Sequence, residues 1–172
     1  YHSNSEKIIM VEIRYDVLGI GNAIVDVLAT TEDSFLVEQD MAKGAMTLID
    51  AERAEQLYAA MAAGTESSGG SAANTVAGVA ALGRRACFVG KVADDQLGQV
   101  FAHDIRAVGV DFLSDPATGG APTARCLINV TPDAMRTMST FLGACVELGP
   151  EDVDEDQIAA SAITYLEGYL WD

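Results

Sequence analysis

Histidine, cysteine and basic residues are scarce in this 172-residue chain, and each scarcity excludes a class of function. Two histidines, His2 and His103, are too few for a histidine-based metal site. The three cysteines are far apart and lie in apolar contexts, so we expect free thiols in a reducing, cytoplasmic compartment. Ten basic residues against 26 acidic ones give a net charge of −16, which argues against nucleic acid or an anionic membrane as partner.

Long apolar runs and phosphate-binding loops are also missing. No run approaches the roughly 18 apolar residues of a membrane-spanning helix, and we expect no signal peptide. No G-x-x-x-x-G-K-[ST] loop occurs, and the dinucleotide pattern that begins at Gly19 fails because position 24 is Ile. The composition, 49% apolar and 21% charged, is that of a folded globular chain. We set residues 1–14 aside as a polar stub that an expression tag would explain.

Strand and helix patterns alternate through the first two-thirds of the chain. Short apolar runs predict strands over 15–21, 25–31, 45–49 and 86–92. Helical spacing and N-cap residues predict helices over 50–64, 72–82 and 95–108, and residues 66–71 are predicted to form a loop. This alternation is typical of a layered α/β fold with a largely parallel sheet.

The pattern changes in the last third of the chain. Consecutive strand patterns over 123–131 and 136–142 flank a Pro-Asp turn and predict an antiparallel hairpin. Residues 151–160 are predicted to be helical, and 162–167 to form a strand. No crossover helix follows that strand, so the sequence suggests a truncated α/β domain over 15–172.

Two polar clusters are candidate binding sites. Asn22 and Asp26 follow a glycine turn at the end of a strand, where open α/β sheets bind ligands. Sugar hydroxyls are suitable donors for such a carboxylate, although Asp26 could equally cap a turn. Gly69 and Gly70 lead into a helix that carries Asn74 in its first turn, an arrangement suited to a ribose or polyol. The alternative is a flexible loop with an ordinary helix cap.

Weaker candidates lie on the strands of the hairpin and before it. Arg136 begins the second hairpin strand and could hold a ligand, or be a solvated charge. Met46 and Phe141 could be walls of an apolar pocket, or ordinary core residues.

Together these segments resemble the ribokinase-like, or PfkB, family of carbohydrate and nucleoside kinases. The matching segments are GNAIVD (21–26), SGGSAANTVAGVAALG (68–83), FVGKVADDQLGQVF (88–101) and PTARCLINVTPDAMRTMSTFLGA (122–144). The first and last of them look most like the adenosine kinase branch.

The resemblance implies a three-layer α/β/α ribokinase-like sandwich, with small antiparallel β-lid strands inserted around 25–49 and 112–144. It implies transfer of the ATP γ-phosphate, with Mg²⁺, to a sugar CH₂OH hydroxyl. By similarity, Asp26 would bind ribose hydroxyls, and Asn22, Gly69, Gly70 and Asn74 would complete the sugar site. Arg136 would close over the substrate, with Met46 and Phe141 as walls for a nucleobase. A homodimer through the lid is a further possibility.

One family motif is absent. The catalytic base and anion hole of the family lie in a G-A-G-D motif that these 172 residues do not contain, so we expect no catalytic residue here and no activity of the chain alone. Two alternatives stay open: a non-catalytic fragment that binds a sugar or partner, and a kinase for a non-nucleoside acceptor such as ribose or fructose.

Overall fold

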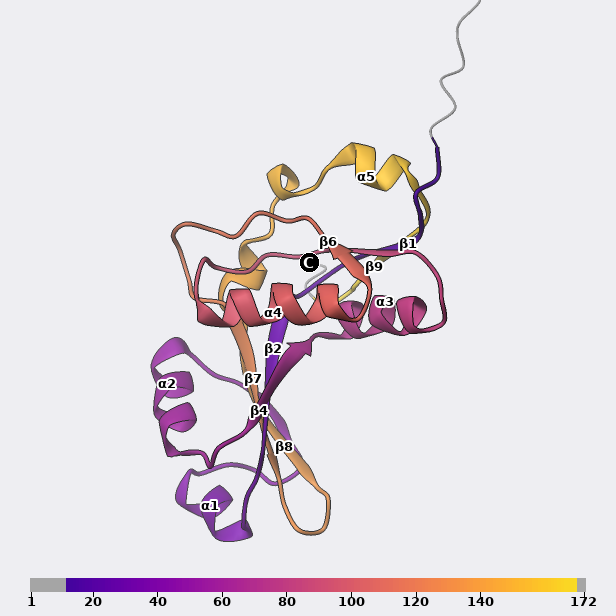
Figure 1. Ribbon diagram of the computed structural model, residues 1–172. Coiled ribbons are helices and arrows are strands. Elements are labelled where there is room, and N and C mark those ends of the chain that lie inside the picture. Colours follow the sequence, from indigo (N-terminus) through magenta and orange to yellow (C-terminus); the bar gives the residue numbers. More distant parts are fainter. Residues whose placement is uncertain (1–11, 170–172) are drawn as a thin grey trace, which may run out of the picture.

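The computed structural model describes residues 12–169, which form two sheets and their covering helices (Figure 1). The main sheet is parallel and has four strands in the order β6-β5-β1-β9. Its strands are β1 (Tyr15–Ile20), β5 (Ala86–Val89), β6 (Val110–Phe112) and β9 (Ser161–Leu166). The parallel core confirms the α/β class, because buried parallel strands need helices on their faces.

The main sheet lies between two helical layers. Helices α3 (Ser71–Ala81) and α4 (Gln96–Ala107) cover one face, and α5 (Glu155–Ala159) lies on the other (Figure 1). Successive side chains of strand β5 point to the two faces in turn. Ala86 and Phe88 join the core under α3 and α4, whereas Cys87 and Val89 pack toward Val153 and Ile158. The predicted three-layer arrangement is therefore confirmed.

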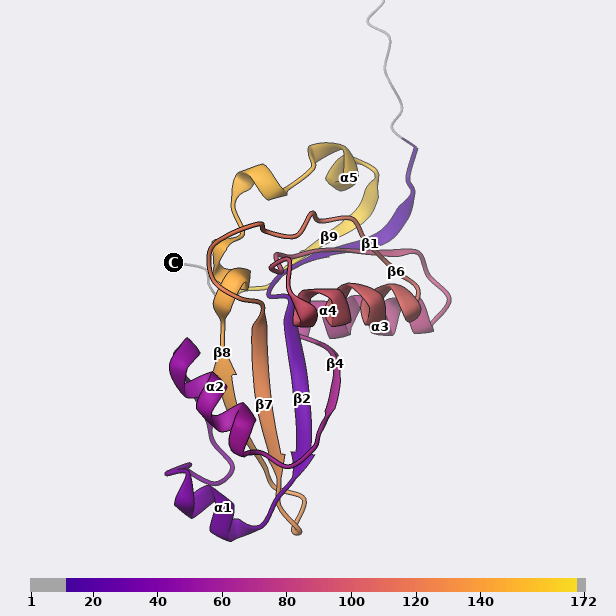
Figure 2. The ribbon, with the colours of Figure 1, turned by 60° about the vertical axis from the view of Figure 1, so that its left-hand side comes forward.

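The second sheet, which we call the lid sheet, projects from the main sheet (Figure 2). It has five strands in the order β3-β8-β7-β2-β4. They are β2 (Ile24–Thr30), β3 (Met46–Leu48), β4 (Thr65–Gly69), β7 (Ala124–Val130) and β8 (Arg136–Phe141). Helices α1 (Asp33–Glu38) and α2 (Ala51–Ala60) lie along one face. These two helices do not cover the other face. We call the two sides of the lid sheet the covered face and the open face.

The predicted hairpin is confirmed, because β7 and β8 pair antiparallel from Arg125–Phe141 to Val130–Arg136. The lid sheet as a whole is mixed, since β2 pairs parallel with β7 and β3 pairs parallel with β8. Of the predicted N-caps, Asp50 is confirmed, and of the alternatives Asp94 and Asp95 the structure has Asp95. Asp50 Oδ1 accepts from Arg53 N and Asp95 Oδ1 from Gly98 N, both at 2.8 Å.

The loop predicted over 66–71 is wrong. Residues Thr65–Gly69 form β4, which pairs antiparallel with β2 and places Ser67 opposite Asp26. Serine and glycine are poor strand formers, so the strand depends on its ladder with β2 rather than on its own side chains. The short elements α1 and β6 were not predicted, and the helix expected over 151–160 is split into a 3₁₀ turn (Pro150–Asp152) and α5.

The three cysteines are buried free thiols, as predicted. Burial raises the pKa of Cys87 and Cys126 to about 11 and that of Cys145 to about 12, so all three stay protonated at neutral pH. Within residues 12–169, no helix has the length and apolar character needed to cross a membrane.

Candidate functional site

The candidate site lies at the carboxyl ends of β1 and β9, where they meet the lid sheet. Asn22 follows β1 and Glu167 follows the neighbouring strand β9. The backbone N–H of Asn22 donates to Glu167 Oε2 at 2.8 Å, and the Ser71 hydroxyl donates to Glu167 Oε1. Glu167 therefore joins β9 to the β1–β2 turn and to the first residue of α3. The carboxyl edge of a parallel sheet is where open α/β folds bind ligands.

Glu167 is the residue of this site that the sequence did not indicate. In the sequence Glu167 is only the last residue of a strand pattern, and it is 145 positions from Asn22 along the chain. A carboxylate directly after a strand is a weak signal without the strand order. Only the adjacency of β1 and β9 brings Glu167 to Asn22.

Asp26 lies inside β2 with its side chain on the open face of the lid sheet. It pairs with Ser67 of β4 and Cys126 of β7, so it caps no turn. The side chain is half-buried and has no hydrogen bond or ion pair to any residue from 12 to 169. Desolvation therefore raises the pKa of the Asp26 carboxyl. A carboxylate withdrawn from water without donors is costly, unless a ligand supplies them.

Two glycines leave room for these polar groups. A Cβ on Gly69 would overlap the carboxyl carbon and both oxygens of Asp26. Gly70 has a φ of +97°, and a Cβ there would overlap the carbonyl oxygen of Asn22. The structure thus places Asn22, Asp26, Gly69 and Gly70 together, at the start of α3.

The open face of the lid sheet next to Asp26 is apolar. One register row across the strands consists of Met46, Met138, Ile128 and Leu28. The adjacent row consists of Leu48, Thr140, Cys126, Asp26 and Ser67. Met46, Leu48 and Leu28 are 56%, 59% and 44% exposed, so an apolar surface lies beside the carboxylate.

The remaining predicted residues lie at different distances from Asp26. Asn74 is in the first turn of α3 with an exposed side chain. Its backbone N–H donates to the Gly70 carbonyl at 2.8 Å. Arg136 is on the open face, but four residues along β8 from Thr140, or about 13 Å at ~3.3 Å per residue. Phe141 pairs with Arg125, whose guanidinium binds Glu55 of α2, so its register assigns it to the covered face.

Metal and phosphate sites are not evident in this part of the protein. Residues 12–169 contain no group of three or more His, Cys, Asp or Glu side chains that could hold a metal ion.

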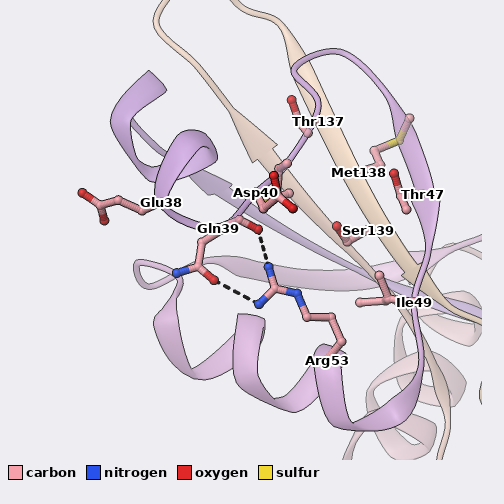
Figure 3. A pocket seen from close by; sticks show the side chains of 10 residues that line it. Glu38, Gln39, Asp40, Thr47, Ile49, Arg53, Thr137, Met138 and Ser139 are labelled. Atoms are coloured by element: carbon pink, nitrogen blue, oxygen red, sulfur yellow. Dashed lines mark hydrogen bonds between the residues drawn. The ribbon is translucent and has the colours of Figure 1, made fainter.

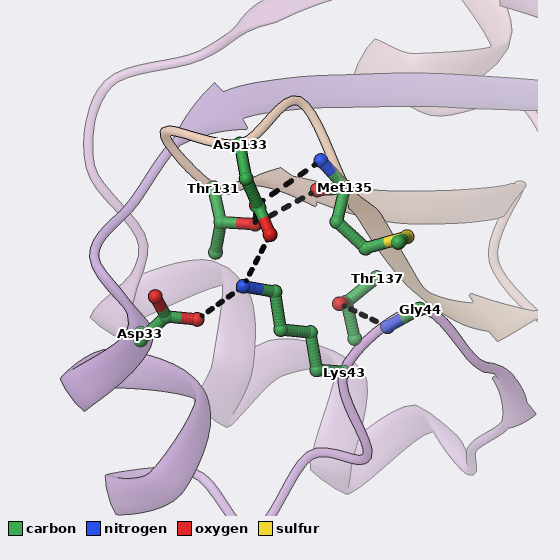
Figure 4. A network of polar contacts seen from close by, with 7 residues as sticks. All are labelled: Asp33, Lys43, Gly44, Thr131, Asp133, Met135 and Thr137. Carbon is green, nitrogen blue, oxygen red and sulfur yellow. Dashed lines mark hydrogen bonds and ion pairs between the residues drawn. The ribbon is translucent and has the colours of Figure 1, made fainter.

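A polar network at the far end of the lid sheet joins α1 to the hairpin turn (Figure 4). Lys43 Nζ lies 2.7 Å from Asp33 Oδ1 and 2.8 Å from Asp133 Oδ2. Asp133 also accepts from the Thr131 hydroxyl at 2.6 Å. Hydrogen bonding to Lys43, then to Thr131, lowers the pKa of Asp133 to about 2. The network orients the hairpin that carries Arg136 and Met138.

Lys43→Met should raise the pKa of Asp133 toward the ordinary aspartate value. Because the folded-state pKa is depressed, the stability from this group is present above the ordinary carboxyl pKa, and is lost as pH falls through about 2. Carbon-detected NMR titration of the Asp133 carboxyl measures the shift. Lys91→Met, which removes a pair with the distant Asp152, should leave it unchanged. An equal Asp133 pKa in wild type and Lys43→Met would contradict this account.

Comparison with known proteins places this geometry in a family context. The model of the pfkB family carbohydrate kinases matches residues 40–172. An adenosine kinase structure from Sinorhizobium meliloti is 63% identical with a TM-score of 0.84, covering 92% of this chain and 48% of that one. A probable sugar kinase structure from Rhizobium etli CFN 42 is 57% identical with a TM-score of 0.85, covering 93% and 48%.

A curated relative shares less of its length. The 5-dehydro-2-deoxygluconokinase of Geobacillus kaustophilus is 32% identical over 107 residues, which are 60% of this chain and 32% of the relative. The chain therefore spans about half the length of the solved structures it matches, and about a third of this curated relative.

Proposed function

The chain belongs to the pfkB family of carbohydrate kinases, and we propose that it supplies the acceptor-binding part of an ATP-dependent nucleoside kinase. The observation that carries the proposal is Asp26, a half-buried carboxylate without a donor among residues 12–169, next to an exposed apolar surface. The acceptor that suits both features is polar at one end and flat and apolar at the other, as a nucleoside is.

The ribose would bind at Asp26. Its two carboxylate oxygens can each accept a hydrogen bond from one hydroxyl of a cis-diol. The missing side chain at Gly69 leaves the room that the carboxyl group occupies. The amide side chains of Asn22 and Asn74 offer further donors and acceptors. Glu167, which already holds the Asn22 backbone, would keep this edge of the site in place.

The base would lie on the apolar row of the lid sheet. Leu28 and Met46 present exposed apolar area on the face that carries Asp26. Arg136, about 13 Å farther along the lid by strand geometry, would reach the acceptor only if the lid sheet closes over it. Closure of a lid excludes water from phosphoryl transfer, which otherwise hydrolyses ATP.

ATP would supply the phosphoryl group, as the family membership suggests. Phosphoryl transfer depends on positioning and on charge neutralisation more than on covalent help from the protein. The residues described here would contribute the positioning of the acceptor hydroxyl. The sequence contains no G-x-x-x-x-G-K-[ST] phosphate loop, and we assign no step of the reaction to ATP or Mg²⁺ within residues 12–169.

A second candidate acceptor is a free sugar. The relatives named as 5-dehydro-2-deoxygluconokinase and fructokinase favour it, since both names describe kinases that act on compounds without a base. A ribose or fructose would use Asp26 in the same way and leave the apolar row uncovered. The two acceptors therefore make opposite predictions about Leu28 and Met46.

Calorimetric titration of the chain with adenosine and with ribose separates them. Burying ~100 Å² of base against the apolar row contributes about 2.5 kcal/mol, so adenosine should bind at least tenfold more tightly. Leu28→Ser should weaken adenosine and leave ribose unchanged. Equal affinities would favour the free sugar, and no saturable binding of either compound would contradict an acceptor site.

Binding and turnover are separable in the same experiment. We expect the 172-residue chain to bind adenosine without transferring phosphate from ATP, because the G-A-G-D motif of the family is absent from it. Phosphate transfer by a preparation of confirmed mass would contradict that expectation, while binding alone is also what a non-catalytic binding fragment would show.

A further inference from the structure

A cavity of about 400 Å³ lies on the covered face of the lid sheet, opposite the face that carries Asp26 (Figure 3). This volume is within the range of small-molecule sites. Strand β3 and the residue after it contribute Thr47 and Ile49, and β8 contributes Thr137 and Ser139. Asp40 closes it from the end of α1 and Arg53 from α2. The cavity is therefore a cleft between the lid strands and their two covering helices.

Several polar groups around the cavity have unused hydrogen-bonding capacity. The Thr47 and Ser139 hydroxyls have no partner among residues 12–169, and Ser139 is only 4% exposed. Arg53 uses N–H groups on the Gln39 side chain at 3.2 Å and on the Gln39 carbonyl, which leaves other N–H groups free. Asp40 takes part in no ion pair of the described residues.

A buried amide behind the cavity points the same way. Asn129 of β7 is 1% exposed, and neither its side-chain nitrogen nor its side-chain oxygen has a partner within the described range 12–169. It pairs in register with Thr137, which lines the cavity. A buried polar group without a partner lowers the stability of the fold, so an apolar interior would be more stable in this part of the lid. The covered face carries polar side chains at positions 47, 129, 137 and 139. These side chains suit a polar ligand better than an apolar one.

We propose that this cavity is a second small-molecule site, which binds a neutral polyhydroxylated compound of about monosaccharide size. The charged side chains around it are Glu38, Asp40 and Arg53, a net charge of −1, which disfavours phosphate and other anions. Hydroxyl groups both donate and accept, so a polyol matches the mixture of hydroxyls, carboxylate and guanidinium. The inference does not depend on the proposed acceptor, because Asp26, Asn22, Gly69 and Gly70 are not among the residues that line the cavity.

The strands that line the cavity also form the open face. On β8, Thr137, Met138 and Ser139 line the cavity, and Met138 also shares the register row of Leu28 on the open face. A ligand in the cavity would therefore contact Met138, which belongs to the apolar row beside Asp26. The bound compound would therefore change acceptor affinity, and the acceptor would change its affinity by the same factor.

The test uses ¹H–¹⁵N NMR of the Asp26→Asn chain, in which the acceptor site is disabled, titrated with D-fructose to tens of millimolar. We expect saturable shifts at the amides of Thr47, Thr137 and Ser139 with one dissociation constant. Ser139→Ala and Thr47→Val, two conservative changes, should each weaken binding at least several-fold. Ser161→Ala, a hydroxyl removed from the start of β9, should have no effect.

Three outcomes overturn the proposal. They are an absence of saturable shifts at these amides, shifts that persist unchanged in both cavity variants, and saturable binding of inorganic phosphate in place of the sugar. Because Asp26→Asn removes the acceptor site, none of them reflects on whether a nucleoside or sugar binds at Asp26.

Discussion

Asp26→Asn is expected to lose about a hundredfold or more in acceptor affinity while unfolding at a higher temperature than the wild-type chain at neutral pH. Charged hydrogen bonds contribute roughly 1.5–3 kcal/mol each, and the carboxylate can accept two from a cis-diol. Complete loss of both hydrogen bonds would cost about 3–6 kcal/mol of binding free energy. Each ~1.4 kcal/mol is a tenfold change in affinity. The opposite changes in affinity and stability are the signature of a binding carboxylate.

The stability gain follows from the sign of the pKa shift. Desolvation raises the pKa of Asp26 in the folded chain, so the stability this group contributes is present in full below its ordinary pKa. That contribution is lost as pH rises through the raised value. Above the raised pKa the wild type carries an ionised carboxylate without a donor among residues 12–169, whereas asparagine carries no charge. The variant should therefore lose less stability than the wild type between about pH 4 and pH 7.

Thermal melts across this pH range and calorimetric titration with adenosine and ribose measure both effects. Asp104→Asn, which removes a half-buried carboxylate from α4, is the matched control and should change neither acceptor affinity nor its pH dependence. A variant that melts lower than the wild type and binds equally well would make Asp26 a structural residue and remove it from the site.

Gly69→Ala should reduce acceptor affinity nearly as much as the loss of Asp26. The new methyl group would occupy the position of the Asp26 carboxyl group, which must rotate away from the place where it meets the acceptor. The crowding should also destabilise the fold by about 1–3 kcal/mol, the usual cost of overpacking. Calorimetry and chemical denaturation measure the two losses separately.

A double-mutant cycle gives this prediction its control. In an Asp26→Ala background the carboxyl group is absent, so adding Gly69→Ala should cost neither further affinity nor much stability. Gly78→Ala in α3 is the matched glycine replacement, since its methyl group would meet no atom within 4 Å, and it should stabilise the helix by about 0.5–1 kcal/mol. Additive losses in the Asp26–Gly69 cycle would show that Gly69 acts on the backbone rather than on Asp26.

Local patterns in the sequence were sufficient for most of the main sheet. Apolar runs such as Tyr15–Ile20 and Ala86–Val89 are buried on both faces, and this is the pattern of a parallel strand. The caps at Asp50 and Asp95 depend on residues three positions away, so they too were predictable. Strand β4 was not, because Thr65–Gly69 has the composition of a loop and is a strand only through its ladder with β2.

The same distinction applies to the candidate site. Asn22, Asp26, Gly69 and Gly70 were recognisable as polar or flexible residues at strand and helix ends. The role of Gly69 was not, since it depends on a carboxyl group from a neighbouring strand. Arg136 and Phe141 show the converse: each is in the expected hairpin, but register places one far along the lid and assigns the other to its covered face.

The amino-acid sequence of this chain was enough to establish the α/β class, the helix caps, the hairpin and the polar segments from which the site is built. Those properties depend on side-chain periodicity and on residues a few positions apart, which a sequence displays directly. Strand order, register and the pairing of β1 with β9 decided that Glu167 joins Asn22, and that Met46, Leu28 and Asp26 share a face. Such contacts join residues far apart in the chain, and their free energy comes from packing and ladder formation that no local pattern encodes.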